Sequence, residues 1–311
     1  MSEHVVAIVN PRASSGACGR RWPKLEPSLR KHWPEAEVWL TEAPRHASVL
    51  ARTALERGAS MVISVGGDGT TNEVLAGFVD PDSGRNQFPE AVLGMVAAGT
   101  GGDFQRMFGS LDPARQIVRL AGAPIKTIDY GWAHFTDHEG ELRRRAFLNV
   151  ASVGVSGVVV RNVARSRRPL GATLAYVDGA LRAIAHWTNV PVRMTIVGQP
   201  ERELNLTLLC IGNGQFFGGG MWACPSAQLE SGRLEAVLLD GLSRGGLVGA
   251  LARSFRGRHI GYRGITSQPI HGVSLDPVDG VEVLIDVDGE QPGRLPARFE
   301  VFGSALRVRV A

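Results

Sequence analysis

The first 130 residues alternate between short apolar runs typical of strands and segments with apolar residues at helical spacing, and this alternation constrains the fold more than any other feature. Strands that alternate with helices are expected to form a parallel sheet with helices on both faces. We predict strands at 5–9, 37–40, 61–65 and 92–96, and helices at 22–31, at 47–56 and from residue 70 onward. The N-terminal part is therefore predicted to be an α/β unit.

After "IKTIDYG", at residues 125–131, the pattern changes to β-type runs, several of which alternate with period two. Such runs favour an antiparallel sandwich or barrel, and we prefer the sandwich. One helix is expected among them, from the apolar stripe formed by Leu174, Val177, Leu181 and Ile184. We predict an α/β domain at 1–130 and a β-rich domain at 131–311, with an active site in the cleft between them.

The segment "VISVGGDGTTNEVLAGF", at residues 62–78, predicts a strand, a glycine-rich turn and a helix. Thr70 and Glu73 have the spacing of a capping box, so we expect the helix to begin at Thr70 with its unpaired N–H groups facing the turn. Such a terminus attracts anions. A carboxylate beside a bound anion needs a cation between them, and Asp68 therefore indicates a phosphate with Mg²⁺. The glycines that would allow close approach of the ligand are Gly66, Gly67 and Gly69.

Two common phosphate-binding motifs are absent from the sequence. A Walker P-loop needs a lysine after its last glycine, and no lysine follows any glycine here. A dinucleotide fingerprint needs a third glycine where Phe104 stands in "GTGGDF". The turn at 66–70 is therefore of a different kind.

Polar turns follow all four predicted strands: "NPRASSG", "TEAPRHA", "GGDGTTNE" and "GTGGDF". Ligands of parallel sheets bind beyond the carboxyl ends of the strands, so these turns should gather at one edge. A single site built from four turns is expected.

The segment "DVDGEQP" follows a β-type run near the C-terminus. Asp-Gly between β-runs is a hairpin signal, which accounts for Asp288 and Gly289. Period-two alternation of the valines and isoleucine places Asp286 and Asp288 together on the other strand face. Paired carboxylates suggest proton or metal chemistry, and we favour catalysis over a simple turn.

Composition narrows the class of protein. The net charge of +4 mildly favours anionic partners. No apolar run reaches the roughly 18 residues of a membrane span, and the start of the chain lacks the apolar run of a signal peptide. The three cysteines have neither disulfide-framework nor zinc-site spacing. We expect a cytoplasmic protein.

The segment "GGDGTTNEV" resembles the signature of the diacylglycerol kinase catalytic domain, which shares GGDGT with NAD kinases. Further blocks similar to that family are "NPRASSG", "TEAPRHA", "GTGGDFQR", "NVASVGVSG", "IGNGQFFGGGMWACPSAQLESG" and "DVDGEQP". The resemblance extends over nearly the whole chain and is closest to the small bacterial lipid kinases.

The resemblance implies an ATP-dependent kinase that uses Mg²⁺. It implies nucleotide contacts for Asn10, Thr41, Gly66, Gly67, Gly69, Thr70, Gly99, Thr100 and Asp103. Asp68 would act through Mg²⁺, and Asp288 would accept the proton of the lipid hydroxyl. Glu290 would orient or share the metal.

Two residues depart from the family pattern. Gly102 stands where Asn is usual, which removes a side-chain hydrogen-bonding group near the site. Ser231 replaces an Asp that helps to bind a second, structural Mg²⁺ in some members. We therefore expect no tightly held second ion at Ser231.

We predict phosphoryl transfer from ATP to a lipid hydroxyl, with diacylglycerol preferred as acceptor. Kinases for a sphingoid base, ceramide or another lipid alcohol, and a nucleotide-binding membrane-associated regulator without turnover, remain alternatives. The expected partner is a lipid at a membrane surface, with no nucleic acid, and a homodimer is left open. Two arginine groups could lie on an anionic bilayer or be solvated surface, namely residues 161, 165, 167 and 168 and residues 253, 256, 258 and 263.

Overall fold

The computed structural model describes residues 3–98, 102–109, 112–165 and 172–310. The chain forms two compact units, the first made of Met1–Ile128 with Ser304–Ala311 and the second of Asp129–Gly303. It crosses from the first unit to the second within strand β5 (Ile125–Thr136) and returns within β16 (Glu290–Arg309).

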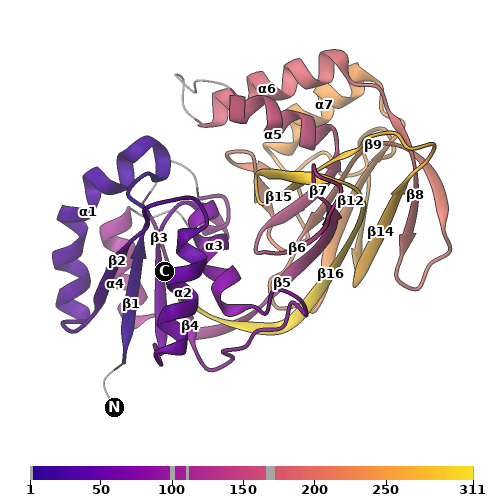
Figure 1. Cartoon of the computed structure of the whole chain (residues 1–311). Coiled ribbons are helices and arrows are strands. Elements are labelled where there is room, and N and C mark those ends of the chain that lie inside the picture. The colour runs from indigo at the N-terminus through magenta and orange to yellow at the C-terminus, as the bar shows by residue number, and fades with distance from the viewer. Residues whose placement is uncertain (1–2, 99–101, 110–111, 166–171, 311) are drawn as a thin grey trace. The chain divides into compact units, whose positions relative to one another are not determined.

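Unit 1 is an α/β unit with a parallel sheet, as predicted, in the strand order β4, β3, β1, β2. Every residue of β1 and β3 is buried, because helices cover both faces (Figure 1). Helices α1 and α4 contribute to the hydrophobic core of one face, and α2 and α3 lie against each other on the opposite side. The elements are β1 (Val5–Val9), α1 (Ala13–His32), β2 (Glu37–Leu40), α2 (His46–Glu56), β3 (Met61–Gly66), α3 (Asp68–Phe78), β4 (Val92–Ala97), η1 (Gln105–Phe108) and α4 (Pro113–Gly122).

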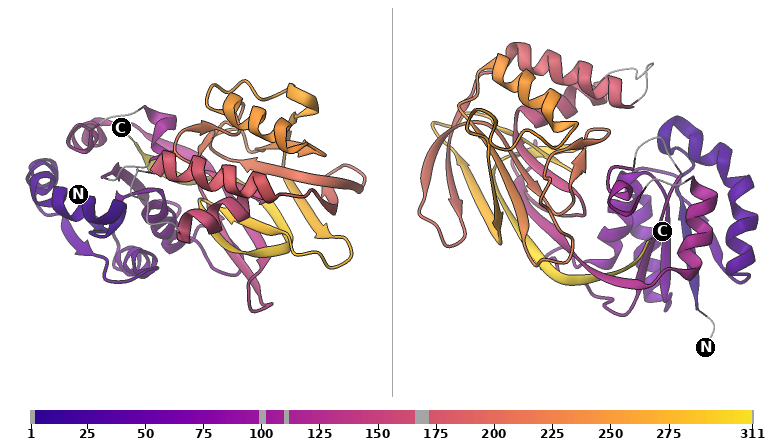
Figure 2. Two further views of the ribbon diagram at one scale, coloured as in Figure 1. Left: turned by 90° about the horizontal axis from the view of Figure 1, so that it is seen from above. Right: turned by 180° about the vertical axis from the view of Figure 1, so that it is seen from behind.

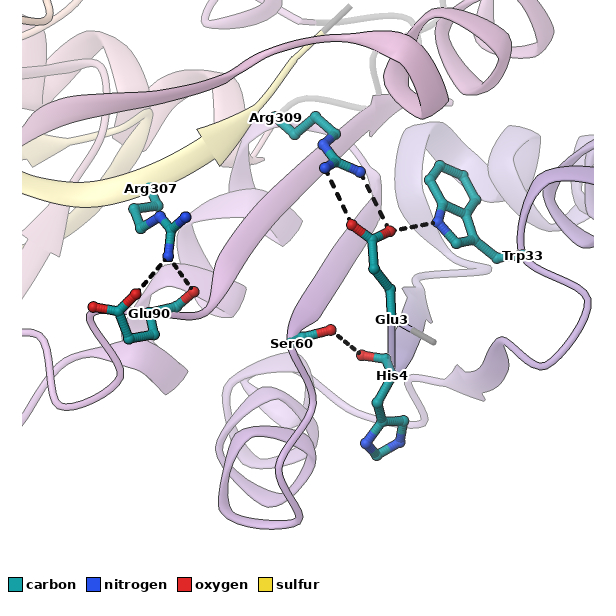
Figure 3. A network of polar contacts seen from close by, with 7 residues as sticks. All are labelled: Glu3, His4, Trp33, Ser60, Glu90, Arg307 and Arg309. Atoms are coloured by element: carbon teal, nitrogen blue, oxygen red, sulfur yellow. Dashed lines mark hydrogen bonds and ion pairs between the residues drawn. The ribbon is translucent and has the colours of Figure 1, made fainter. Parts of the chain in front are cut away.

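The end of β16 belongs to unit 1, although the prediction assigned all of 131–311 to the second domain. Arg307 and Arg309 lie where β16 pairs in parallel with β4. Figure 3 shows the partners of both side chains. The Arg309 guanidinium donates to the two oxygens of the Glu3 carboxylate, at 3.2 Å and 3.4 Å. The Arg307 guanidinium donates to the Glu90 carboxylate at 2.8 Å. The indole N–H of Trp33 donates to the same Glu3 carboxylate at 3.0 Å. A sequence-local pattern cannot assign such a strand, since its partner lies more than 200 residues away.

Unit 2 is β-rich, as predicted, and its described strand pairings are antiparallel. Its large core lies between the strands, and a second core lies beneath α5, α6 and α7, which Figure 2 shows grouped together. Besides β5 and β16, its elements are β6 (Leu142–Phe147), β7 (Val150–Gly154), α5 (Val155–Arg165), α6 (Ala172–His186), β8 (Val190–Ile196), β9 (Arg202–Gly212), β10 (Phe216–Phe217), β11 (Met221–Trp222), β12 (Leu234–Asp240), α7 (Arg244–Ser254), η2 (Tyr262–Gly264), β13 (Thr266–Ile270), β14 (Gly272–Pro277) and β15 (Leu284–Val287).

The expected helix near residues 174–184 is confirmed as α6, but its packing differs from the apolar stripe. Of the predicted stripe, Ile184 is buried, whereas Leu174 and Leu181 are 57% and 46% exposed; Ala180 and Ala183 are buried beside Ile184. The small residues face the core because they let the helix approach its neighbours closely. Helices α5 and α7 were not predicted.

Candidate active site

The turn between β3 and α3 differs from the predicted capping box. Helix α3 begins at Asp68, two residues before Thr70, and its N-cap Gly67 makes no side-chain cap bond. The Thr70 hydroxyl instead accepts a hydrogen bond from the Asn10 side-chain amide at 3.0 Å. The Glu73 carboxylate accepts the backbone N–H groups at the start of α2. The positive end of the helix dipole at the start of α3 suits an anion.

Gly66 and Gly67 differ in what a side chain would meet there. A Cβ atom at Gly66 would lie 2.4 Å from the Thr70 hydroxyl oxygen, so packing explains this glycine. A Cβ at Gly67 would meet no described atom within 4 Å, and the backbone there is extended, a conformation open to any residue. Open space at Gly67 leaves room for a ligand against the backbone, and Gly69 lies in the first turn of α3.

Asp68 links this turn to the segment after β4. Its carboxylate accepts the backbone N–H of Asp103 at 2.8 Å and that of Phe104 at 3.4 Å. Asp103 is 8% exposed and pairs with Arg106 at 3.2 Å. The predicted contacts at Gly99 and Thr100 lie outside the described residues.

The two remaining predicted nucleotide contacts follow β1 and β2. Asn10 donates its backbone N–H to Val65 at the end of β3, at 3.0 Å, which joins it to the glycine turn. Thr41 is buried, and its N–H donates to the carbonyl of Val9 at 2.9 Å. The turns after β1, β2 and β3 thus lie at one sheet edge, because these strands are neighbours and parallel.

The residues at this edge fit Mg²⁺ with a phosphorylated ligand. Mg²⁺ is usually bound by one or two carboxylates together with substrate phosphates and water. Asp68 supplies a carboxylate, an oxygen ligand of the kind that Mg²⁺ prefers, and this carboxylate accepts the N–H groups of Asp103 and Phe104. No cluster of three or more His, Cys, Asp or Glu residues that could hold a metal occurs in the described part of the chain.

In unit 2, Asp288 and Gly289 form the two-residue loop of a hairpin, with φ of 49° and 81° and with Val287 paired to Glu290. This is the predicted Asp-Gly turn. The Asp288 carboxylate also accepts the backbone N–H groups of Leu148 at 2.9 Å and of Asn149 and Val150 at 3.0 Å. These donors occupy lone pairs of the carboxylate that a proton would need.

Asp286 does not share an exposed strand face with Asp288. It is fully buried on β15, where one oxygen accepts the Gly289 N–H at 2.8 Å and the other accepts the Ser152 hydroxyl at 3.2 Å. Burial, with the nearby Asp288 charge adding to it, raises the pKa of Asp286 to about 8, although Gly289, Ser152 and Arg145 act in the opposite direction.

Glu290 begins β16 and is exposed. Its carboxylate forms an ion pair with Arg145 at 2.6 Å. The sequence did not indicate this partner, because Arg145 lies 145 residues earlier in the chain. The proposed metal-binding role of Glu290 stays a prediction.

The loop at Ser231 is closed by its own hydrogen bonds. The Ser231 hydroxyl lies 2.9 Å from the Gln228 carbonyl and 3.0 Å from that of Arg233. The neighbouring Gly232 N–H donates to Asp129, a buried carboxylate that the sequence analysis missed, at 2.6 Å. The absence of a second Mg²⁺ at Ser231 stays a prediction.

Unit 2 also contains an apolar pocket, with a cavity volume of about 70 Å³, beneath α5, α6 and α7. Its wall includes Val159, Ala180 and Leu247, one from each helix. The side chains with polar atoms in the wall are Ser156, Tyr176, Cys210, Ser254 and His259. Sequence reasoning missed this pocket because its wall is assembled from six or more separate segments.

The two units correspond to two known domains. Residues 4–133 match the diacylglycerol kinase catalytic domain, and residues 149–310 match the YegS C-terminal NAD kinase beta sandwich-like domain. The chain therefore belongs to the diacylglycerol kinase catalytic domain family, in the bacterial type that carries the YegS C-terminal domain.

Curated relatives align over almost their full length. A diacylglycerol kinase of Mycobacterium tuberculosis is 28% identical over 98% of this chain and 94% of its own. A diacylglycerol kinase of Staphylococcus carnosus is 26% identical over 96% of this chain and 92% of its own. A solved diacylglycerol kinase structure from Bacillus anthracis has a TM-score of 0.71 at 19% identity, over 99% of this chain and 97% of that one. The solved structure supports the fold alone.

Among the described residues, no helix combines the length and apolarity needed to cross a membrane.

Proposed function

We propose that this protein is an ATP-dependent lipid kinase that transfers the γ-phosphate to a lipid hydroxyl, with diacylglycerol as the expected acceptor. The observation that supports a lipid acceptor is the pocket beneath α5, α6 and α7, whose wall is almost entirely apolar. Apolar pockets with a few polar groups are typical of small-molecule sites. The names of the relatives are consistent with this proposal.

The glycine turn is proposed to bind the phosphates. The helix N-terminus at the start of α3 and the open space at Gly67 support this role. Asn10 and Thr70, joined by a hydrogen bond, would line the nucleotide site together with Thr41 and Asp103. Mg²⁺ held by Asp68 would neutralise charge on the phosphates during transfer.

The lipid hydroxyl must lose its proton as the bond to phosphorus forms. Asp288 is the predicted acceptor of this proton, and its carboxylate already accepts three backbone N–H groups. The carboxylate pair of Asp286 and Asp288 stays our proposal for the destination of the proton. We also expect the protein to be cytoplasmic and to meet its substrate at a membrane surface.

The direct test is transfer of labelled γ-phosphate from ATP to a panel of lipid alcohols, with and without Mg²⁺. Diacylglycerol, a sphingoid base, ceramide and NAD would be compared at equal ATP. We expect Mg²⁺-dependent labelling of diacylglycerol. Labelling of ceramide or the sphingoid base would reassign the acceptor, whereas labelling of NAD and no lipid would refute the proposal. Nucleotide binding without any turnover would indicate a regulator.

A further inference from the structure

Three places in unit 2 combine a residue of the pocket wall with an exposed apolar neighbour. Met221 on β11, Ser254 at the end of α7, and His259 in the loop after α7 form part of the wall. The residue that follows each of them is apolar and exposed: Trp222 (37%), Phe255 (39%) and Ile260 (37%). The backbone that walls the pocket therefore also carries apolar side chains on its outer side.

The exposed apolar residues belong to one surface. Trp222 lies against the loop after α7, because a Cβ atom at Gly257 would be only 2.9 Å from its indole ring. Gly257 stands between Phe255 and Ile260 in that loop. The Trp222 indole also stacks on the ring of Phe216, with the ring centroids 5.2 Å apart. An exposed apolar group of this kind, beside a pocket, indicates a partner.

The same loop is positively charged. Arg256 and Arg258 are exposed, and neither forms an ion pair with any described residue of the chain. Residues 241–275 contain no aspartate or glutamate. On α6, which packs against α7, the exposed Asp178 carboxylate is already paired with Arg182 at 3.0 Å. The charges of Arg256 and Arg258 are therefore available to an anionic partner.

Two further arginines of this segment are held in place by an aromatic ring. The guanidinium carbons of Arg253 and Arg263 lie 3.9 Å and 5.6 Å from the centroid of the Tyr262 ring. Arg253 also donates to the Gly249 carbonyl at 3.0 Å. These contacts restrict long side chains that would otherwise lose rotamer freedom on binding, so part of the ordering cost is already met in the free protein.

We propose that this surface binds an anionic lipid bilayer and thereby brings the wall of the apolar pocket to the headgroup region. We call it the docking surface, and it consists of Trp222 and the exposed side chains of residues 253–263. The inference deepens the proposed function and rests on it for the role of the pocket, whereas bilayer binding itself needs no turnover.

The chemistry of the docking surface favours a bilayer over a nucleic acid. Arginine pairs well with phosphate groups, which both partners offer. Apolar side chains gain free energy only where they leave water, and a bilayer lets Phe255 and Ile260 enter the acyl boundary while the arginines hold the headgroups. Tryptophan is enriched at the same depth of membranes. A nucleic acid backbone would use the arginines and leave Ile260 in water.

The first experiment measures cosedimentation of the full chain with vesicles, without ATP or diacylglycerol. The vesicles contain phosphatidylcholine and phosphatidylglycerol at a ratio of about two to one, so that their surface is anionic. Arg256→Gln combined with Arg258→Gln removes two charges from the docking surface. Each charge near such a surface contributes about fivefold to binding, so we expect the partition coefficient to fall about 30-fold.

A matched control removes the same charge elsewhere in unit 2. Arg193 and Arg202 are exposed on β8 and β9, and Arg193 lies opposite Glu203 in the strand pair. Arg193→Gln combined with Arg202→Gln should keep binding within about threefold of wild type, because these residues lie outside the docking surface. Melting temperatures should show that both double variants are folded.

A second experiment tests whether the apolar side chains enter the bilayer. The three native cysteines are buried, so a dye sensitive to polarity can be attached to an introduced thiol. On Ile260→Cys the dye should become brighter and shift its emission to the blue when anionic vesicles are added. On Val197→Cys, at a 59% exposed position in the turn after β8, it should not change.

Either experiment can overturn the inference. The docking surface is refuted if the two double variants bind vesicles equally, or if the dye on Ile260→Cys reports water in the presence of vesicles. Tighter binding of the wild type to a single-stranded RNA than to vesicles would also refute it. The proposed function fails separately: vesicle binding without phosphorylation of any lipid would support the docking surface and refute the kinase.

Discussion

Replacing Asp288 by Asn preserves the shape of the side chain but changes what it can accept. One carboxylate oxygen accepts the N–H groups of Asn149 and Val150, and the other accepts that of Leu148. An amide has a single oxygen, so its NH₂ group must face one of these donors. The sequence alone suggested that Asn would be tolerated, because it accepts the same turn conformation. The contacts predict a loss of stability instead.

The magnitude follows from the three bonds. A buried N–H without a partner costs about 1–3 kcal/mol, and Leu148 is 2% exposed. The other two bonds lose their charge assistance, which is roughly half of their strength. Allowing for the easier desolvation of a neutral amide, we expect Asp288→Asn to lower the free energy of unfolding by about 2–4 kcal/mol. For a unit of this size, that lowers the melting temperature by about 5–10 °C.

A matched control exists in the same unit. Asp279 and Gly280 form another Asp-Gly pair with φ of 54° and 69°. Within the described part of the chain, the Asp279 side chain makes no hydrogen bond, and the residue is exposed. Asp279→Asn should change the free energy of unfolding by less than about 0.5 kcal/mol.

The assay is thermal and urea unfolding of both variants and of wild type, in one buffer. Equal melting temperatures for Asp288→Asn and Asp279→Asn, within about 1 °C, would refute the argument from the three N–H groups. Turnover of Asp288→Asn should then be compared at a temperature well below its melting point. Any loss of phosphoryl transfer at that temperature reflects a change in the active site and not unfolding of the protein.

Three further predictions concern charge and metal. Asp68→Asn should lower turnover by orders of magnitude while the melting temperature shows a folded protein, because it removes the charge that balances Mg²⁺; near-normal turnover would mean that the loop is only a turn. A crystal soaked in Mg²⁺ should show no well-ordered ion bound to Ser231, since a hydroxyl is a weak substitute for a carboxylate ligand. The pKa of Asp286 rises from 3.8 to about 8 on folding, so its contribution to stability should be lost as the pH rises from about 4 to about 8. The difference in melting temperature between Asp286→Asn and wild type should therefore shift in favour of the variant over that range, and a constant difference would contradict a raised pKa.

The amino-acid sequence determined the parts of this protein that depend on near neighbours. The alternation of strand-like and helix-like apolar runs specified a parallel sheet. Buried strands and the helices that connect them differ in the sequence spacing of their apolar residues, so each can be recognised from the sequence. The Asp288–Gly289 hairpin was also readable, since left-handed backbone conformations favour these residues.

Only the tertiary structure decided what the polar side chains contact. Thr70 and Glu73 have capping-box spacing, yet Thr70 binds Asn10, 60 residues away, and Glu73 caps α2. The Asp288 carboxylate binds N–H groups 138–140 residues earlier in the chain. A hydrogen bond depends on distance in space, and no local pattern records which distant donor the fold brings near.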